Sequence, residues 1–256
     1  MRTLSSPGYV DLKRSLYREY SRSYDEDRRQ FVSAQALAYR IEWALESLES
    51  GQHVLDLGCG SGELLLEAAR HTQGNAVLLG LDLTSEMLAL ARTRAGPDVG
   101  LIEANALDGL PFQDTSFHLV TSLNLVQELP ASAIPGLLAE VRRVLKPGGA
   151  FKAIIPCIEG NNPSSRLFRE LAIHCGAMDF LFAEDLENLL REEPCLVHKE
   201  FQLSHSSAAS ASARRATRFK FFTRLMEEIQ NQGLDPAQVQ QGVLFFTGRR
   251  DFVKQA

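Results

Sequence analysis

Short apolar runs alternate with amphipathic helical patterns through the middle of this 256-residue chain. We predict strands at residues 53–57, 76–81, 99–102, 117–122 and 150–155 because these runs are short, apolar and flanked by turn-forming residues. Helical patterns at 62–71, 87–94 and 131–145 lie between them. Strands that alternate with helices form right-handed crossovers, which give a parallel sheet covered by helices on both faces. The pattern therefore predicts a doubly wound α/β domain.

The chain on either side of this segment extends the same architecture. An amphipathic helix is predicted at 30–49, before the first strand. After Pro156 we expect helices at 164–177, 183–191 and 214–230, an extended segment at 195–203 and a last strand at 242–248. These additions predict a Rossmann-like, seven-stranded and mostly parallel sheet whose last strand is antiparallel.

A glycine-rich loop, Asp56–Gly62, joins the first predicted strand to the helix that follows it. Its glycines stand at alternate positions (58, 60 and 62), where glycine permits a tight turn and a close approach of the backbone to a ligand. The loop lacks the third glycine of the Gly-x-Gly-x-x-Gly dinucleotide fingerprint. It also places Glu63 at the helix start, where a pyrophosphate would meet a competing anion. A ligand without phosphates fits this loop better.

An acidic residue, Asp82, ends the second predicted strand 24 residues after Gly58. In this topology a carboxylate at that point can accept hydrogen bonds from both vicinal hydroxyls of a ribose. The same carboxylate would repel a 2′-phosphate. The loop and Asp82 together predict a site for a nucleoside-containing ligand and argue against NADP.

With these residues in place, the chain resembles the class I S-adenosylmethionine (AdoMet)-dependent methyltransferases, in particular the small-molecule branch that includes ubiquinone/menaquinone-biosynthesis C-methyltransferases. The resemblance covers about residues 30–156 and rests on five stretches in the family's order: Val54–Gly62, Gly80–Leu88, Ala104–Phe112, Phe117–Ser122 and Leu145–Gly149. It implies a lid segment at 1–29 and a methyltransferase domain at 30–256. Within that domain it implies an AdoMet-binding core at 50–156, and a substrate-side insert with the final strands at 157–256.

The resemblance also implies which residues bind AdoMet. Asp82 would hold the ribose, and Asn105 would face the adenine amino group. Tyr24 would cover the site and Arg28 would pair with the methionine carboxylate, although this segment also reads as an ordinary solvated helix. The full expected set is Tyr24, Arg28, Asp56, Gly58, Cys59, Gly60, Asp82, Leu83, Met87, Asn105, Ala106, Ser122 and Leu123.

The expected reaction is an in-line transfer of the AdoMet methyl group to a small-molecule acceptor, which leaves S-adenosylhomocysteine (AdoHcy). The donor is already activated, so positioning supplies most of the catalysis and a base is needed only if the acceptor must lose a proton. Candidates for that base are Gln127, Glu128 and His174, with His198 and His205 as further possibilities. Aromatic residues within 157–190 form either an acceptor pocket or ordinary core. The segment 214–224, which is rich in basic and aromatic residues, contacts either an anionic acceptor or partner, or solvent.

Composition limits the partners. The net charge is −5 with no long Lys/Arg run, so nucleic acid is not an expected substrate. No apolar run is long enough for a membrane span, and the N-terminus lacks a signal peptide, so we expect a cytoplasmic protein. We expect it to be a monomer or a homodimer. The four cysteines form no CxxC pair, and no metal site is expected.

Two other functions remain open. A non-catalytic AdoMet-binding regulatory protein would keep the same fold and site. An NAD-dependent oxidoreductase is disfavoured by the glycine spacing.

Overall fold

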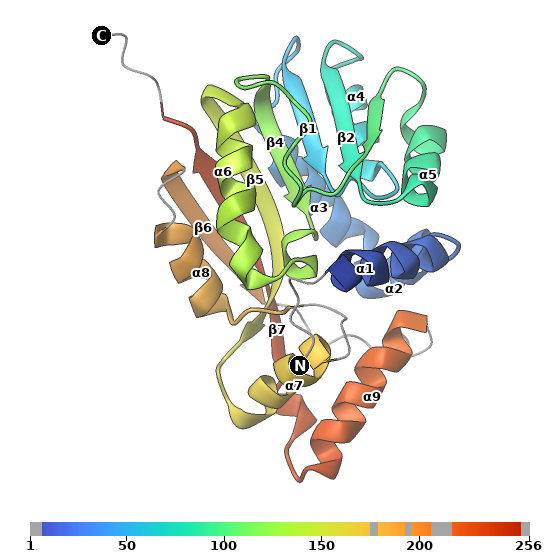
Figure 1. Ribbon diagram of the computed structural model, residues 1–256, viewed down its shortest axis with the longest axis vertical. Coiled ribbons are helices and arrows are strands. Elements are labelled where there is room, and N and C mark those ends of the chain that lie inside the picture. The colour runs from blue at the N-terminus through green and yellow to red at the C-terminus, as the bar shows by residue number, and fades with distance from the viewer. Residues whose placement is uncertain (1–6, 175–178, 193–195, 206–216, 252–256) are drawn as a thin grey trace.

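A seven-stranded sheet forms the centre of the computed structural model, which describes residues 7–174, 179–192, 196–205 and 217–251 (Figure 1). The strand order is β3-β2-β1-β4-β5-β7-β6, and β7 runs antiparallel to both of its neighbours. The strands are β1 (His53–Leu57), β2 (Val77–Asp82), β3 (Gly100–Glu103), β4 (Phe117–Leu123), β5 (Leu145–Glu159), β6 (Val197–His205) and β7 (Gln240–Arg249). The expected Rossmann-like sheet with an antiparallel last strand is thus confirmed.

Helices cover both faces of the sheet. On one face lie α3 (Ala34–Leu45) and α4 (Glu63–His71), with α5 (Ser85–Ala95) packed against α4 and β3. The other face is covered by α6 (Ile134–Val144) and α8 (Ala183–Glu192). Short 3-10 helices, η1 (Val126–Glu128), η2 (Ala131–Ala133) and η4 (Pro236–Gln238), follow β4 or precede β7.

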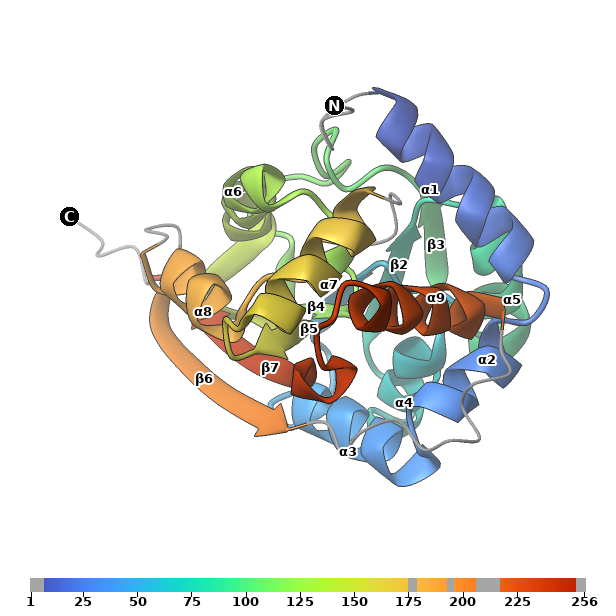
Figure 2. The same ribbon diagram turned by 90° about the horizontal axis from the view of Figure 1, so that it is seen from below.

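Four further helices lie beyond the carboxyl ends of the central strands. Helices α1 (Pro7–Tyr20) and α2 (Tyr24–Phe31) cross below the ends of β1 and β2 in Figure 1. Helices α7 (Pro163–His174) and α9 (Thr217–Asn231) contact each other further below, and the view from below in Figure 2 shows them in front of the sheet. This end of the molecule is therefore enclosed by segments from both termini of the chain.

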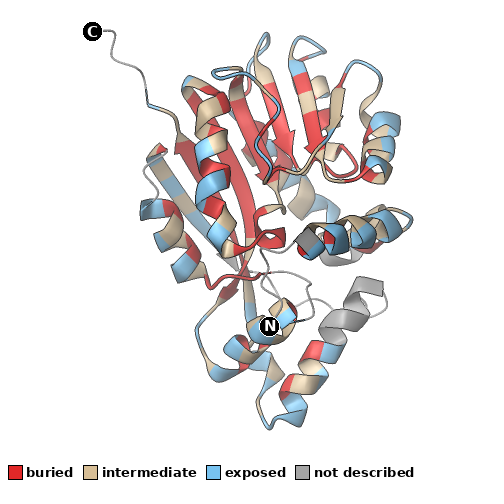
Figure 3. Cartoon of the chain, in the orientation of Figure 1, coloured by how far each residue is buried: buried red, intermediate tan, exposed pale blue. Residues whose placement is uncertain are grey.

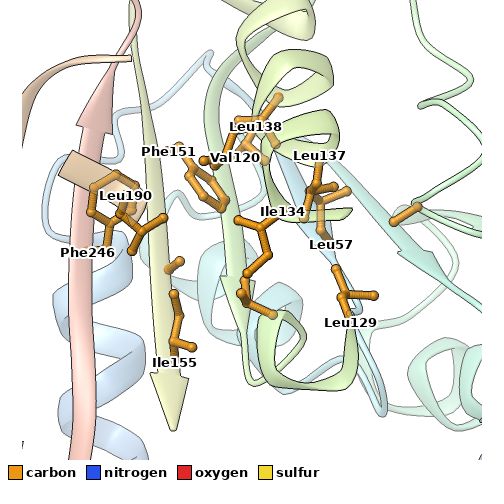
Figure 4. Close-up of a cluster of buried hydrophobic side chains, with 14 of the residues drawn as sticks. Leu57, Val120, Leu129, Ile134, Leu137, Leu138, Phe151, Ile155, Leu190 and Phe246 are labelled. Carbon is orange, nitrogen blue, oxygen red and sulfur yellow. The ribbon is translucent and has the colours of Figure 1, made fainter. Parts of the chain in front are cut away.

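The core lies between the central strands and α6. Phe151 of β5 and Val120 of β4 are fully buried against Leu137 and Leu138 of α6, and Phe246 of β7 extends the cluster toward α8 (Figure 4). The central strands are buried along nearly their whole length, whereas the helices are exposed on their outer faces (Figure 3). Asp56 and Asp82 stand at the carboxyl ends of the two strands β1 and β2.

Most predicted elements differ from the observed ones by one to three residues at an end, and two differ more. The helix expected at 30–49 is interrupted at Ser33, whose hydroxyl accepts a hydrogen bond from the amide of Ala36 (3.1 Å) and so starts a new helix, α3. The strand expected at 150–155 runs from Leu145 to Glu159. It extends to Glu159 because β7 pairs with it past Pro156, and to Leu145 because that residue pairs with Phe117 of β4. Both corrections change boundaries and leave the order of elements as predicted.

The aromatic residues of the insert are core. Phe168, Phe180 and Phe182 are buried in a cluster with Leu225 and Ile229 of α9. This favours the core interpretation of the insert over an acceptor pocket. Met178 and the basic residues Arg214 and Arg215 lie outside the described residues.

No helix in the described parts of the chain is long and apolar enough to cross a membrane.

Candidate functional site

A cleft opens at the carboxyl ends of β1, β2 and β4, beneath α1. It encloses about 800 Å3 of empty space, part of it open to solvent. Its lining falls into two sets, which we call the loop side and the lid side. The loop side consists of Gly58, Gly60, Leu81, Asp82, Leu83, Met87, Ala104, Asn105, Ala106 and Leu107. The lid side consists of Tyr9, Val10, Lys13, Tyr17, Tyr24, Leu123, Asn124, Leu125, Glu128 and Leu129.

The glycine-rich loop has the backbone conformation that its sequence requires. Gly58, Gly60 and Gly62 all have positive φ angles, of 68°, 53° and 78°. A Cβ atom on Gly60 would lie in the cleft, 3.4 Å from Oη of Tyr24. A Cβ atom on Gly62 would come within 2.9 Å of Ala91, so this glycine lets the loop pack closely on α5. Gly60 thus keeps the cleft open, and Gly62 allows the loop to pack closely on α5.

Two carboxyl groups stand beside the loop, of which Asp56 is buried and Asp82 is partly buried. Asp82 accepts hydrogen bonds from the amides of Gly60 (2.9 Å) and Thr84 (3.1 Å), and Asp56 accepts one from the hydroxyl of Thr121 (2.8 Å). Burial raises the pKa of Asp82. Burial and the nearby Asp82 charge raise the pKa of Asp56 to about 7, against the opposing effect of the Thr121 hydrogen bond.

Neither carboxyl group forms an ion pair with a basic side chain in the described parts of the chain. A buried carboxylate is costly unless its charge is compensated. The pair Asp56 and Asp82 is therefore suited to a ligand that brings hydroxyl donors and positive charge.

The titration of Asp56 predicts how stability depends on pH. Its pKa in the folded protein, about 7, lies above the model-compound value of 3.8. The folded state therefore holds the Asp56 proton more tightly than the unfolded state, and the free energy of unfolding falls as the pH rises from about 4 to about 7. Asp56→Asn is expected to remove this contribution, so that the variant gains stability relative to the wild type between pH 5 and pH 8. Urea unfolding of the ligand-free proteins at several pH values measures the difference, and a difference independent of pH would contradict the assignment.

Helices α1 and α2 are held over the loop by ion pairs. Asp25 binds Arg94 of α5 and accepts a hydrogen bond from Ser61 of the loop (3.0 Å). Burial opposes ionisation of Asp25, but the hydrogen bond and charge of Arg94 prevail and lower its pKa. On α1, Arg18 binds Glu86 at the start of α5 (2.8 Å). The lid is thus attached to α5 and to the glycine-rich loop.

The structure places Arg28 away from its expected role. Its guanidinium binds Glu63 at the start of α4 and lies 3.8 Å from Asp25, and it does not line the cleft. Glu63, which the sequence marked as unfavourable for a phosphate, is thus the partner of a lid residue.

Most of the other expected cofactor residues meet in the cleft. Of the predicted set, the lining contains Tyr24, Gly58, Gly60, Asp82, Leu83, Met87, Asn105, Ala106 and Leu123. Cys59, Asp56 and Ser122 are buried just behind it. The hydroxyl oxygen of Ser122 has no hydrogen-bond partner among the residues that the structure describes.

The candidate catalytic bases differ in their position relative to the cleft. Glu128 lines the cleft, whereas Gln127 is turned toward a small cavity beside Asp179. His174 and His198 are exposed, and neither lines the cleft. The side chain of His205 lies outside the described residues.

The sequence interpretation assigned residues 1–29 to a lid but named neither Tyr9 nor Lys13 as a site residue. Tyr9, Lys13 and Tyr17 all line the cleft, and they recur every fourth residue along one face of the helix. That spacing, with a lysine inside an aromatic stripe, was a usable signal.

The sequence of this chain is similar to those of known methyltransferases. Residues 54–149 match the family described as "Methyltransferase domain". The chain is 33% identical over 162 residues to the demethylmenaquinone methyltransferase of Symbiobacterium thermophilum, covering 61% of this chain and 62% of that protein. It is 37% identical over 138 residues to the 2-phytyl-1,4-naphtoquinone methyltransferase of Trichormus variabilis, covering 51% and 56%. The chain thus spans somewhat more than half the length of these curated relatives.

Solved structures share the whole fold at lower identity. The cyclase SpnF superposes with a TM-score of 0.68 at 17% identity, covering 95% of this chain and 97% of that one. The geranyl diphosphate C-methyltransferase of Streptomyces coelicolor gives a TM-score of 0.61 at 16% identity, covering 84% and 77%. Because one of these proteins is a cyclase, the likeness establishes the fold and not the reaction.

Proposed function

From the membership of residues 54–149 in the methyltransferase-domain family, with the class I fold around them, we propose that this chain is an AdoMet-dependent methyltransferase acting on a small molecule. The observation that carries the proposal is the juxtaposition of Asp56, which is buried, and Asp82, which is partly buried, beside a loop that exposes Gly60 to the cleft. Neither carboxyl group has a basic partner in the described structure. AdoMet offers the complementary groups: vicinal ribose hydroxyls, an ammonium group and a sulfonium.

The cleft residues divide the work of holding AdoMet. Asp82 accepts hydrogen bonds from the ribose hydroxyls, while Gly58 and Gly60 leave room for the ligand along the loop. Asp56 stands behind the loop as an acceptor for the ammonium group, directly or through water. When bound, AdoMet supplies an already activated methyl group. The remaining task of the protein is to position the acceptor and exclude water.

The adenine is assigned to the apolar part of the loop side. Met87 is almost fully buried at the start of α5, and Leu83 and Ala106 lie in the same lining. Asn105 supplies an amide carbonyl for the adenine amino group. Leu123 at the end of β4 and the neighbouring Ser122 are assigned to the region of the sulfonium.

The lid assignment is kept for residues 1–29 and rests on α1 and α2. Tyr24 covers Gly60, and Tyr20 packs edge-on against it with ring centroids 5.2 Å apart. Arg28 is not assigned to the methionine carboxylate, because it already binds Glu63. Residues 30–256 are kept as the methyltransferase domain, with its core at 50–156.

The proposed acceptor is an apolar ring compound of the size of a naphthoquinone. The names of the curated relatives support this class, and so do the apolar and aromatic side chains of the lid side, such as Val10, Tyr17, Leu125 and Leu129.

A methyl-transfer assay tests the proposal. The protein is incubated with AdoMet and a panel of reduced naphthoquinones, phenols and amines, and AdoHcy is measured. Turnover with at least one ring compound is expected. Binding of AdoMet without AdoHcy formation on any acceptor would favour the alternative, a non-catalytic AdoMet-binding regulator.

One sequence feature favours the alternative function, an NAD-dependent oxidoreductase. Tyr9 and Lys13 on α1 have the Tyr-x-x-x-Lys spacing of a catalytic pair in NAD-dependent enzymes. In this structure both side chains are bound to Glu128, on the lid side of the cleft. The pair is therefore already committed to another interaction.

A further inference from the structure

A buried ion pair joins the two segments that form the lid side of the cleft. Nζ of Lys13 on α1 lies 2.7 Å from Oε2 of Glu128 in η1, and the two side chains are only 5% and 7% exposed. The free-energy cost of removing two charges from water can exceed the gain from their attraction. With Asp82, they are the charged residues of the described lining. An ion pair at this place therefore calls for a functional reason.

The surroundings hold Glu128 in one position. Oη of Tyr9 donates a hydrogen bond to the backbone carbonyl of Glu128 (2.6 Å), and the ammonium of Lys13 lies 5.2 Å from the Tyr9 ring centroid. Burial, followed by the charges of Glu128 and Asp179, raises the pKa of Tyr9, so its hydroxyl stays protonated. Glu128 is thus fixed by the same helix that carries its cationic partner.

A second set of contacts supports η1 from the opposite side. The amide of Asp179 donates to the carbonyl of Gln127 (2.9 Å), and its carboxylate accepts from the amide of Ala131 (3.2 Å). Arg169 of α7 binds that carboxylate (3.0 Å). Residues on both sides of Glu128 are therefore anchored, and the carboxylate is preorganised at the cleft wall.

The neighbours of the pair define what it can recognise. Tyr17, Leu125 and Leu129 form an apolar wall on the lid side, so the pair is the charged feature of an otherwise apolar and aromatic surface. A carboxylate accepts a proton or a hydrogen bond, and an ammonium beside it stabilises a negative oxygen. A ring hydroxyl uses both groups at once, whereas an ether or a carbonyl can use only the ammonium.

We propose that Lys13 and Glu128 form the acceptor-recognition site, which binds a ring hydroxyl of an aromatic acceptor and takes up its proton. This inference rests on the proposed methyltransferase function. The acceptor O–H bond breaks, its proton passes to Oε2 of Glu128, and the electron pair stays on the ring oxygen. The ammonium of Lys13 keeps its protons and pairs with the resulting oxyanion. Because Lys13 belongs to α1, the site is complete only when this helix is docked.

The test compares 1-naphthol with its methyl ether, 1-methoxynaphthalene, in which a methyl group replaces the hydroxyl hydrogen. Both are titrated into the full-length protein saturated with AdoHcy, and the absorption of bound naphthol reports whether it is naphtholate. We expect the wild type to bind 1-naphthol at least about tenfold more tightly than its methyl ether and to show naphtholate absorption. Glu128→Gln and Lys13→Met are each expected to reduce the preference to within about twofold, and Glu128→Gln to abolish the naphtholate signal.

Controls separate recognition from folding. A single substitution leaves one buried charge unpaired, so the double variant Lys13→Met/Glu128→Gln is measured as well, because it removes both charges with similar side-chain volumes. Arg14→Met removes an exposed ion pair within α1, with Asp11 (3.6 Å), outside the cleft and away from the contacts that hold α1 in place. It is expected to keep the full preference for 1-naphthol.

The outcomes also separate this inference from the proposed function. If AdoMet and AdoHcy bind normally but the wild type shows no preference for 1-naphthol, or the double variant keeps that preference, the acceptor-recognition site is wrong and the methyltransferase proposal stands. If neither AdoMet nor AdoHcy binds to the wild type, both proposals fall.

Discussion

Gly60→Val is expected to weaken AdoMet binding by more than about 100-fold, equivalent to about 3 kcal/mol, while the fold is retained. A Cβ atom at this position would lie 3.4 Å from Oη of Tyr24 and 3.5 Å from Cε of Met87, and both residues line the cleft. The two methyl groups of valine would extend further into the space assigned to the cofactor. Isothermal titration with AdoMet measures the loss.

A matched control addresses backbone strain. Gly60 has φ of 53°, and valine in this conformation costs about 1–2 kcal/mol of stability by itself. Gly74 has φ of 78° and no atom within 4 Å of its would-be Cβ, so Gly74→Val carries similar strain away from the cleft. We expect Gly74→Val to bind AdoMet like the wild type. Equal losses of affinity in the two variants would show that strain, and not occupation of the cleft, is responsible.

Asp82→Asn is expected to weaken AdoMet binding much more than it changes stability. AdoMet affinity should fall by about 1–3 kcal/mol, or about 5- to 150-fold, because hydrogen bonds from the ribose to a charged acceptor are lost. Burial disfavours the charged form of Asp82 in the ligand-free protein, so the substitution removes an unfavourable charge. The amides of Gly60 and Thr84 donate to different oxygens of the carboxylate, however, and asparagine keeps an acceptor for only one of them. These effects oppose each other, so the free energy of unfolding should change by less than about 1 kcal/mol.

The two measurements must be made on the same preparation. Titration calorimetry gives the affinity, and urea unfolding without ligand gives the stability. Unchanged AdoMet affinity would remove Asp82 from the site. A joint loss of affinity and stability would indicate a structural role for the carboxylate instead.

Local sequence signals were sufficient for the sheet. The strand His53–Leu57 was predicted with its observed bounds because Gly51 and Gly58 flank a short apolar run. The extent of β5 was not predictable in this way. Its continuation to Glu159 depends on pairing with β7, about ninety residues later in the chain, and no local pattern shows that pairing.

The loop side of the cleft was predictable for a similar reason. Its residues follow β1, β2 and β3 directly, and parallel topology brings the carboxyl ends of strands together. On the lid side, Tyr24, Leu123 and Glu128 were expected from the sequence, but the pairing of Glu128 with Lys13 was not predictable. The two residues lie 115 positions apart, and only the packing of α1 brings them together. For Arg28 a carboxylate partner was expected, but its identity as Glu63, 35 residues away, was not.

The central claim is that the cleft binds AdoMet, and equilibrium titration of the full chain with AdoMet, AdoHcy and NAD tests it most directly. AdoMet and AdoHcy are each expected to bind at one site per chain, Gly60→Val is expected to weaken both interactions by more than about 100-fold, and NAD is expected not to bind. Binding of NAD without binding of AdoMet would contradict the account.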